Sequence, residues 1–190
     1  PIEFDKIKKE RFAEVIDRMK DIRNAQDAFK TVNGRYANNF ESLVAFVDTG
    51  KYTITQQRDS SYMEFDKVYQ IDMLQEVKII DTLGFVSVKD SLFNDSDIYY
   101  NMMIVPFAKY NDNFKMKADI IEISGYRAHV YEVKVPKSVV LHDQPKDLLS
   151  RENAQVSVEE VNGPEIKVGS LTEVSTSGNW PPIYDKKGDQ

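Results

Sequence analysis

The chain has 190 residues, a formal net charge of −6 at pH 7 and no cysteine. This length suits one medium domain with its own hydrophobic core. The acidic balance argues against general nucleic-acid binding, which depends on Lys and Arg neutralising phosphates. The lack of cysteine excludes disulfides, thiolate metal sites and cysteine nucleophiles.

The first predicted element is an amphipathic helix over about residues 5–32. Apolar side chains recur there every three or four residues, which places them on one stripe of a helix: Phe12, Val15, Ile16, Met19, Ile22 and Phe29. The other faces carry interleaved acidic and basic side chains, as in a solvated helix. We therefore expect this stripe to pack on a sheet and residues 1–9 to form a solvated stalk.

The segment Asn-Gly-Arg-Tyr at 33–36 is predicted to end this helix. Gly34 can adopt the left-handed backbone conformation of a helix C-terminus without a Cβ penalty. A short helix is predicted over about residues 40–49, capped by one of the two asparagines before it. We expect Tyr36 to pack at the junction between the long helix and the sheet.

Segments rich in β-branched and aromatic residues predict antiparallel strands over about residues 67–142. The candidate segments are 67–80, 82–93, 97–107, 113–124, 126–136 and 137–143. Alternation in the first of them is imperfect, so a helix remains an alternative there. Three or four such strands in succession would form a β-meander.

The remaining segment, residues 143–190, is rich in Gly, Pro, Ser and Thr, and Trp180 is one of its few large apolar residues. It predicts a partly ordered C-terminal extension that includes one short helix. The sequence thus predicts an α+β fold in which residues 1–142 form one domain, with the long helix packed on the β-meander.

The chemistry-bearing residues form no known catalytic motif for nucleotide binding, serine hydrolysis or zinc proteolysis. Asp95 and Asp97 are weak metal candidates in an acidic stretch, because a polar turn between two apolar runs is the simpler explanation. Tyr99, Tyr100 and Trp180 could stack on a ligand, but strand and core packing is the simpler explanation. We therefore predict no catalytic residue, no cofactor and no metal.

Residues 22–47, IRNAQDAFKTVNGRYANNFESLVAFV, resemble the soluble half of the N-terminal helix of type IV pilins and type II secretion pseudopilins. In those families a polar-Gly-x-Tyr element ends the helix, and a short helix and a β-meander follow. Ala37 stands where pilins usually have Pro. The resemblance implies a pilin-like fold with a structural role.

Most of the chain also resembles an uncharacterised family of single-span envelope proteins of Gram-negative bacteria, through VSVKDSLF, MIVPF, FKMKAD and KVGSLTEVSTSGNW. This resemblance implies a membrane helix ahead of Pro1, an inner-membrane anchor and a periplasmic location. It brings no known activity with it.

We expect a non-enzymatic, membrane-anchored structural or assembly component of the cell envelope. Its expected partners are proteins of an envelope assembly, with self-association included, and not nucleic acid. One alternative is a periplasmic adaptor of a secretion or pilus assembly complex that dimerises through its stalk. Another is a ligand- or glycan-binding protein or an enzyme.

Overall fold

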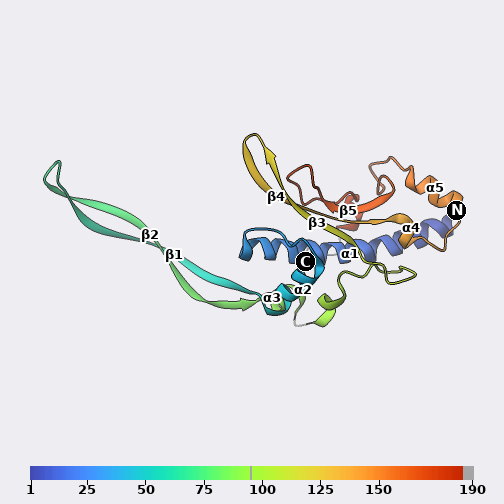
Figure 1. Ribbon diagram of the computed structural model, residues 1–190, viewed down its shortest axis with the longest axis horizontal. Coiled ribbons are helices and arrows are strands. Elements are labelled where there is room, and N and C mark those ends of the chain that lie inside the picture. The colour runs from blue at the N-terminus through green and yellow to red at the C-terminus, as the bar shows by residue number, and fades with distance from the viewer. Residues whose placement is uncertain (95, 186–190) are drawn as a thin grey trace.

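The computed structural model describes residues 1–94 and 96–185. It confirms an α+β fold with a long N-terminal helix followed by antiparallel sheets. The helices are α1 (Ile2–Asn33), α2 (Phe40–Thr49), α3 (Val88–Phe93), α4 (Lys137–Val140) and α5 (Lys146–Asn153), with 3-10 turns η1 (Asp97–Asn101) and η2 (Pro182–Tyr184). The strands are β1 (Lys51–Asp66), β2 (Ile71–Ser87), β3 (Lys115–Ile123), β4 (Tyr126–Pro136) and β5 (Glu165–Gly169). Strands β1 and β2 form one sheet, and β3, β4 and β5 form the other (Figure 1).

Helix α1 runs along the body and supplies one side of its core (Figure 1). The predicted stripe is buried, and Phe12, Val15, Met19 and Ile22 are fully inaccessible to solvent. The helix ends at Gly34, whose φ of 76° is left-handed and whose N–H donates to the carbonyl of Lys30. An amphipathic pattern and a local stop signal therefore specify this element.

The N-terminal turns of α1 are not a free stalk, so the prediction of a solvated stalk over residues 1–9 is wrong. Phe4 is only 7% exposed and belongs to the core. Lys8 is also buried, and its ammonium group contacts the carboxylates of Glu152 and Glu160 at 3.1 Å each. The beginning of α1 therefore packs on the C-terminal part of the chain.

The three-stranded sheet has the order β3-β4-β5 and is antiparallel throughout. Tyr131, Val133 and Val135 alternate along β4 and point into the core. Strand β5 pairs with β4 through Val168 opposite Val133. The segment predicted to be a C-terminal extension thus contributes a strand to this sheet, and the sheet continues beyond residue 142.

Two predicted strands take other conformations. Residues 137–143 begin with helix α4, where the N–H of Leu141 donates to the carbonyl of Lys137. Residues 97–107 begin with η1, and only an isolated bridge joins Ile104 to Asn113. In η1 the Ser96 hydroxyl accepts from the N–H of Ile98, which favours a turn over an extended strand.

The β1–β2 hairpin, called the arm below, extends away from the body (Figure 1). Its first strand begins at Lys51, ahead of residue 67, where the strands were expected to begin. At its tip, the Asp66 carboxylate accepts from the N–H groups of Val68 and Tyr69. At its base, the N–H of Val88 donates to the carbonyl of Gly50. The body thus holds the arm at the end opposite its tip.

Candidate protein-interaction surface

The distal half of the arm exposes large apolar side chains on both strands and on the turn between them. Val68 is 83% exposed and Tyr69 is 72% exposed. The exposed set in this half is Tyr62, Met63, Phe65, Val68, Tyr69, Ile71, Met73 and Leu74. Summed over both faces and the turn, these side chains present roughly 1,000 Å² of apolar surface. For comparison, the largest single patch on a typical monomer is about 300–600 Å².

A hairpin of two strands has no second layer to cover either of its faces. Such a hairpin is marginally stable on its own, because a sheet needs a third strand or a packed helix to bury an apolar face. Between Lys51 and Ser87 the chain is almost entirely exposed or half-buried in strand conformation. Within residues 1–94 and 96–185, no second layer covers the distal arm, so its large apolar side chains stay exposed to solvent.

The strand register sorts the arm's side chains onto two faces. Met63 lies opposite Leu74, Phe65 lies opposite Asp72, and the next position of the same face contains Glu76. Because alternate residues share a face, these five side chains lie together near the tip. We call them the acidic-apolar face of the arm.

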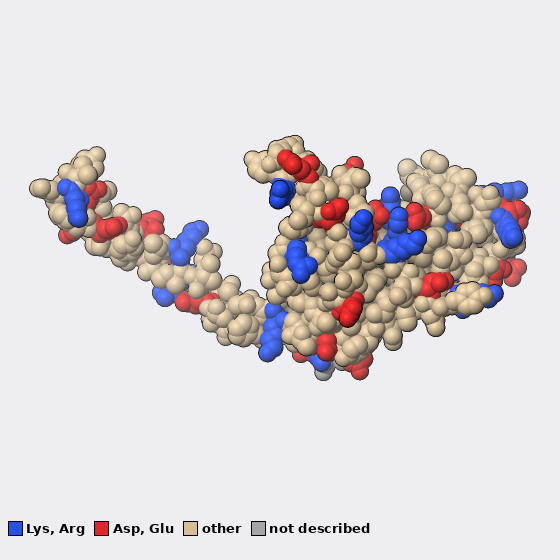
Figure 2. Space-filling view, viewed as in Figure 1, with Lys and Arg blue, Asp and Glu red and all other residues tan. Residues whose placement is uncertain are grey.

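The arm carries more acid than base. Residues 51–87 contain six Asp and Glu residues and four Lys and Arg residues. Arg58 forms an ion pair with Asp81 at 2.7 Å, and Asp59 lies opposite Lys78. These pairs neutralise the middle of the arm, and acidic groups are visible again toward its distal end (Figure 2).

A row of lysines crosses the three-stranded sheet on the face that points away from the core. Lys134 on β4 lies opposite Lys115 on β3 and opposite Lys167 on β5. Like charges placed directly opposite each other destabilise a sheet. The carboxylates nearest to Lys134 are those of Glu132 and Glu165, at 3.7 and 3.9 Å. Basic and acidic side chains are interspersed on the part of the body that contains this sheet (Figure 2).

A buried ionic cluster joins α1, α4 and α5. The Lys137 ammonium donates to the side chain and carbonyl of Glu152 and to the carbonyl of Val161, which uses all three of its donors. Burial lowers the pKa of Lys137. Burial acts in the same direction on Lys8, but hydrogen bonds to Glu160 and Glu152 outweigh it and raise the Lys8 pKa. The groups satisfy one another, which indicates a structural role.

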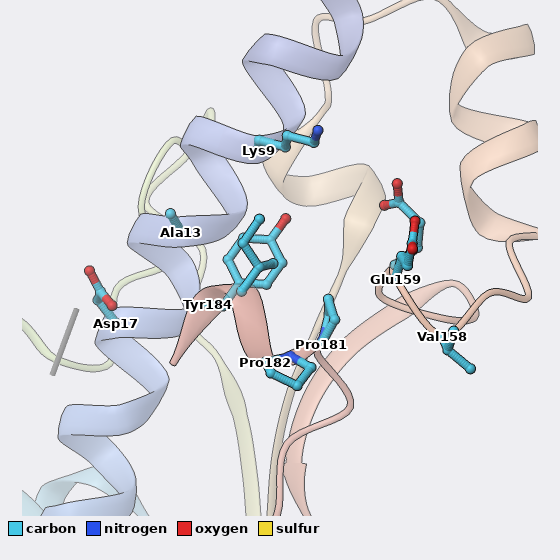
Figure 3. A pocket seen from close by; sticks show the side chains of 10 residues that line it. Lys9, Ala13, Asp17, Val158, Glu159, Pro181, Pro182 and Tyr184 are labelled. Atoms are coloured by element: carbon cyan, nitrogen blue, oxygen red, sulfur yellow. The ribbon is translucent and has the colours of Figure 1, made fainter. Parts of the chain in front are cut away.

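A pocket of about 480 Å³ lies between α1, residues 158–160 and η2. Figure 3 shows Lys9 and Asp17 on the α1 side, Glu159 on the other side and Tyr184 between them. Burial raises the pKa of Tyr184 to about 12, so its hydroxyl stays protonated at neutral pH. Among the described residues that line it, none is a serine, cysteine or histidine that could act as a nucleophile with a base.

The residues that the sequence suggested for ligand binding have other contacts. Both Tyr99 and Tyr100 donate their hydroxyls to one oxygen of Asp48, at 2.7 and 3.0 Å, and these hydrogen bonds lower the Asp48 pKa. Trp180 is 9% exposed and donates its indole N–H to Asp185. None of these three aromatic residues lines the pocket.

The metal candidates do not form a site in the described part of the chain. Asp95 lies outside the described residues, and Asp97 is exposed at the start of η1. Within residues 1–94 and 96–185, no three His, Asp or Glu side chains are grouped as metal ligands would be.

The structure also places the residues predicted to have a structural role. Phe12, Val15, Met19, Ile22, Phe29, Tyr36 and Trp180 are buried in one hydrophobic core, and Gly34 ends α1. Sequence reasoning missed Lys8 and Lys137 as buried polar residues. Gln26 is also buried, and its position on the apolar stripe of α1 indicates this burial from the sequence.

No helix in the described part of the chain is long and apolar enough to cross a membrane. Comparison of the sequence with protein-family models and with curated proteins, and of the structure with solved structures, finds no match.

Proposed function

We propose that this chain is a non-enzymatic assembly protein that binds a protein partner through its β1–β2 arm. The observation that supports this most strongly is the set of exposed apolar side chains on an arm without a covering layer. A protein partner can cover such a surface and complete the sheet by adding a strand or a second layer. The saturated contacts of Lys137, Tyr99 and Tyr100 also favour a structural role over a catalytic one.

We further propose that the protein acts in the cell envelope of Gram-negative bacteria as a pilin-like structural or assembly component. An anchor ahead of Pro1 would hold it at the inner membrane. The pilin-like role rests on the resemblance of residues 22–47 to pilins and pseudopilins, and the anchor and location rest on the resemblance of most of the chain to single-span envelope proteins. The order of a long helix, a short helix and an antiparallel sheet is compatible with it.

Photo-cross-linking in intact cells tests whether the arm binds protein. A benzophenone side chain is introduced in place of Phe65, which is 56% exposed on the arm. The matched control carries it in place of Tyr110, an exposed aromatic residue of the body. We expect discrete protein adducts from position 65 and none from position 110. If position 65 gives no discrete adduct, or the same adducts as position 110, the proposal is wrong.

A further inference from the structure

We propose that the arm's partner is a second copy of this chain, and that the acidic-apolar face of the arm docks on the outer face of that copy's three-stranded sheet. This inference rests on the proposed protein-binding function of the arm. Each copy would then carry both halves of the interface, the arm and the sheet face that receives it.

The receiving face has a small excess of positive charge, because its four lysines outnumber the carboxylates of Asp119, Glu132 and Glu165 on the same face. Its lysine row is formed by Lys115, Lys134 and Lys167, and Lys117 lies two residues further along β3 on the same face. The repulsion within this row is relieved when carboxylates from outside approach it. Asp72 and Glu76 on the arm are exposed carboxylates of the required sign.

The spacing of the charges also fits. Asp72 and Glu76 are four residues apart on one strand, which separates them by roughly 13 Å. The three lysines occupy neighbouring strands, so the row extends over roughly 10 Å. Flexible lysine side chains can bridge the difference, and both carboxylates can therefore contact the row at the same time.

Apolar groups accompany the charges on both surfaces. On the outer face of the sheet, strand alternation places Ile121, Ile123 and Tyr126 near the turn between β3 and β4. Tyr126 is 78% exposed there. The acidic-apolar face presents Met63, Phe65 and Leu74 beside its two carboxylates. Both surfaces thus combine an apolar patch with a charged patch, and the charges are of opposite sign.

The geometry assigns the two surfaces to different copies. The arm leads away from the sheet of its own chain (Figure 1), so the sheet it covers belongs to another molecule. The face that docks carries Met63, Phe65 and Leu74, which offer roughly 300 Å² of apolar surface, and its carboxylates and backbone add polar area toward the about 800 Å² that a specific interface buries on each partner. The contact is therefore partly apolar and partly ionic, and the charge pairs are needed to hold two copies together.

Charge reversal and recombination test this docking. The arm variant carries Asp72→Lys and Glu76→Lys, and the sheet variant carries Lys115→Glu, Lys117→Glu and Lys167→Glu; all five side chains are exposed. Lys134 is left unchanged because it contacts Glu132 and Glu165. Molar mass is measured by light scattering as a function of protein concentration.

We expect the wild type to associate. Each variant alone should associate at least about tenfold more weakly than the wild type. An equimolar mixture of the two variants should recover the wild-type mass, because each arm then meets a sheet of opposite charge. A control with three other exposed lysines reversed, Lys6→Glu, Lys109→Glu and Lys146→Glu, should associate as the wild type does. Association of the wild type should also weaken as salt is raised.

Two results would overturn the inference. The first is a wild-type chain that stays at 21.9 kDa at every concentration while position 65 cross-links to a different protein. In that case the arm binds protein, but its partner is not a second copy of this chain. Variants that associate like the wild type, or a mixture that does not recover association, refute the docking surface. If a variant fails to fold, the wild type still tests the docking, because its association should weaken as salt is raised.

Discussion

The side chain of Gln26 forms a pair of hydrogen bonds with the backbone of Ala37. Its amide NH₂ donates to the Ala37 carbonyl and its amide oxygen accepts from the Ala37 N–H, both at 2.8 Å. Gln26 is fully buried in α1, and Ala37 follows the turn after Gly34. The pair therefore fastens the chain reversal to the helix from which it departs.

Replacing Gln26 with Met should lower the free energy of unfolding by about 3 kcal/mol. The substitution retains most of the side-chain volume but leaves the N–H and carbonyl of Ala37 buried without their partner, at about 1–3 kcal/mol per group. Denaturant unfolding measures the change. The matched control is Glu14→Met at an exposed position of α1, which should shift stability by less than about 0.5 kcal/mol. Equal effects of the two substitutions would show that the amide pair contributes nothing.

Tyr36 packs between α1 and the sheet, with its ring centroid 4.6 Å from that of Tyr131 on β4. Truncation of a large buried aromatic side chain leaves a cavity, so Tyr36→Ala should lower stability by about 3 kcal/mol. Thermal melting of Tyr36→Ala beside Tyr110→Ala, an exposed control, measures this. A Tyr36→Ala protein that melts like the wild type would exclude the packing role.

Glu152 is the shared acceptor of two buried ammonium groups, those of Lys8 and Lys137. Glu152→Gln leaves them without their common carboxylate and should lower stability by about 4 kcal/mol, since removing one partner of a buried ion pair is strongly destabilising. Replacing all three residues by Met should cost much less, because no buried charge then lacks a partner. Denaturant unfolding compares the two proteins, and a triple variant less stable than Glu152→Gln would contradict this explanation.

The Arg11 guanidinium donates to both carboxylate oxygens of Asp143, at 2.7 and 2.9 Å, and this contact lowers the pKa of Asp143. A carboxyl group with a lowered folded-state pKa stabilises the fold above its unfolded pKa of about 4, and this stability is lost as pH falls below it. The stability difference between wild type and Asp143→Asn should therefore be constant near neutral pH and shrink below about pH 4. A difference that does not change with pH would exclude the ion pair as its source.

Local sequence signals predicted the parts of the fold that depend on neighbouring residues. The period of the apolar residues in α1 and the glycine at position 34 specify where that helix is buried and where it ends. The pairing of β5 with β4 joins residues about 30 positions apart, and a local pattern cannot show such a partner. The strand predicted over 137–143 is wrong because the chain forms helix α4 there, and the contact that buries Lys137 comes from Glu152, 15 residues further along, which a local pattern cannot show.

The arm illustrates a different limit of sequence reasoning. Its apolar residues give a strand signal, but a strand signal does not show whether the same chain covers those residues. Only the register and exposure of β1 and β2 show that no other described segment covers them. The exposed apolar surface of the arm therefore emerged from the structure, whereas the long helix could be recognised in advance.

Amide hydrogen exchange at low and high protein concentration tests most directly whether the arm is covered by another molecule. The experiment compares peptides of β1 and β2 with peptides of the core of α1 within the same sample. We predict that the arm exchanges quickly when dilute and becomes protected as concentration rises, together with β3 and β5, while α1 is unchanged. An arm whose exchange rate is the same at every concentration would contradict self-association through this surface.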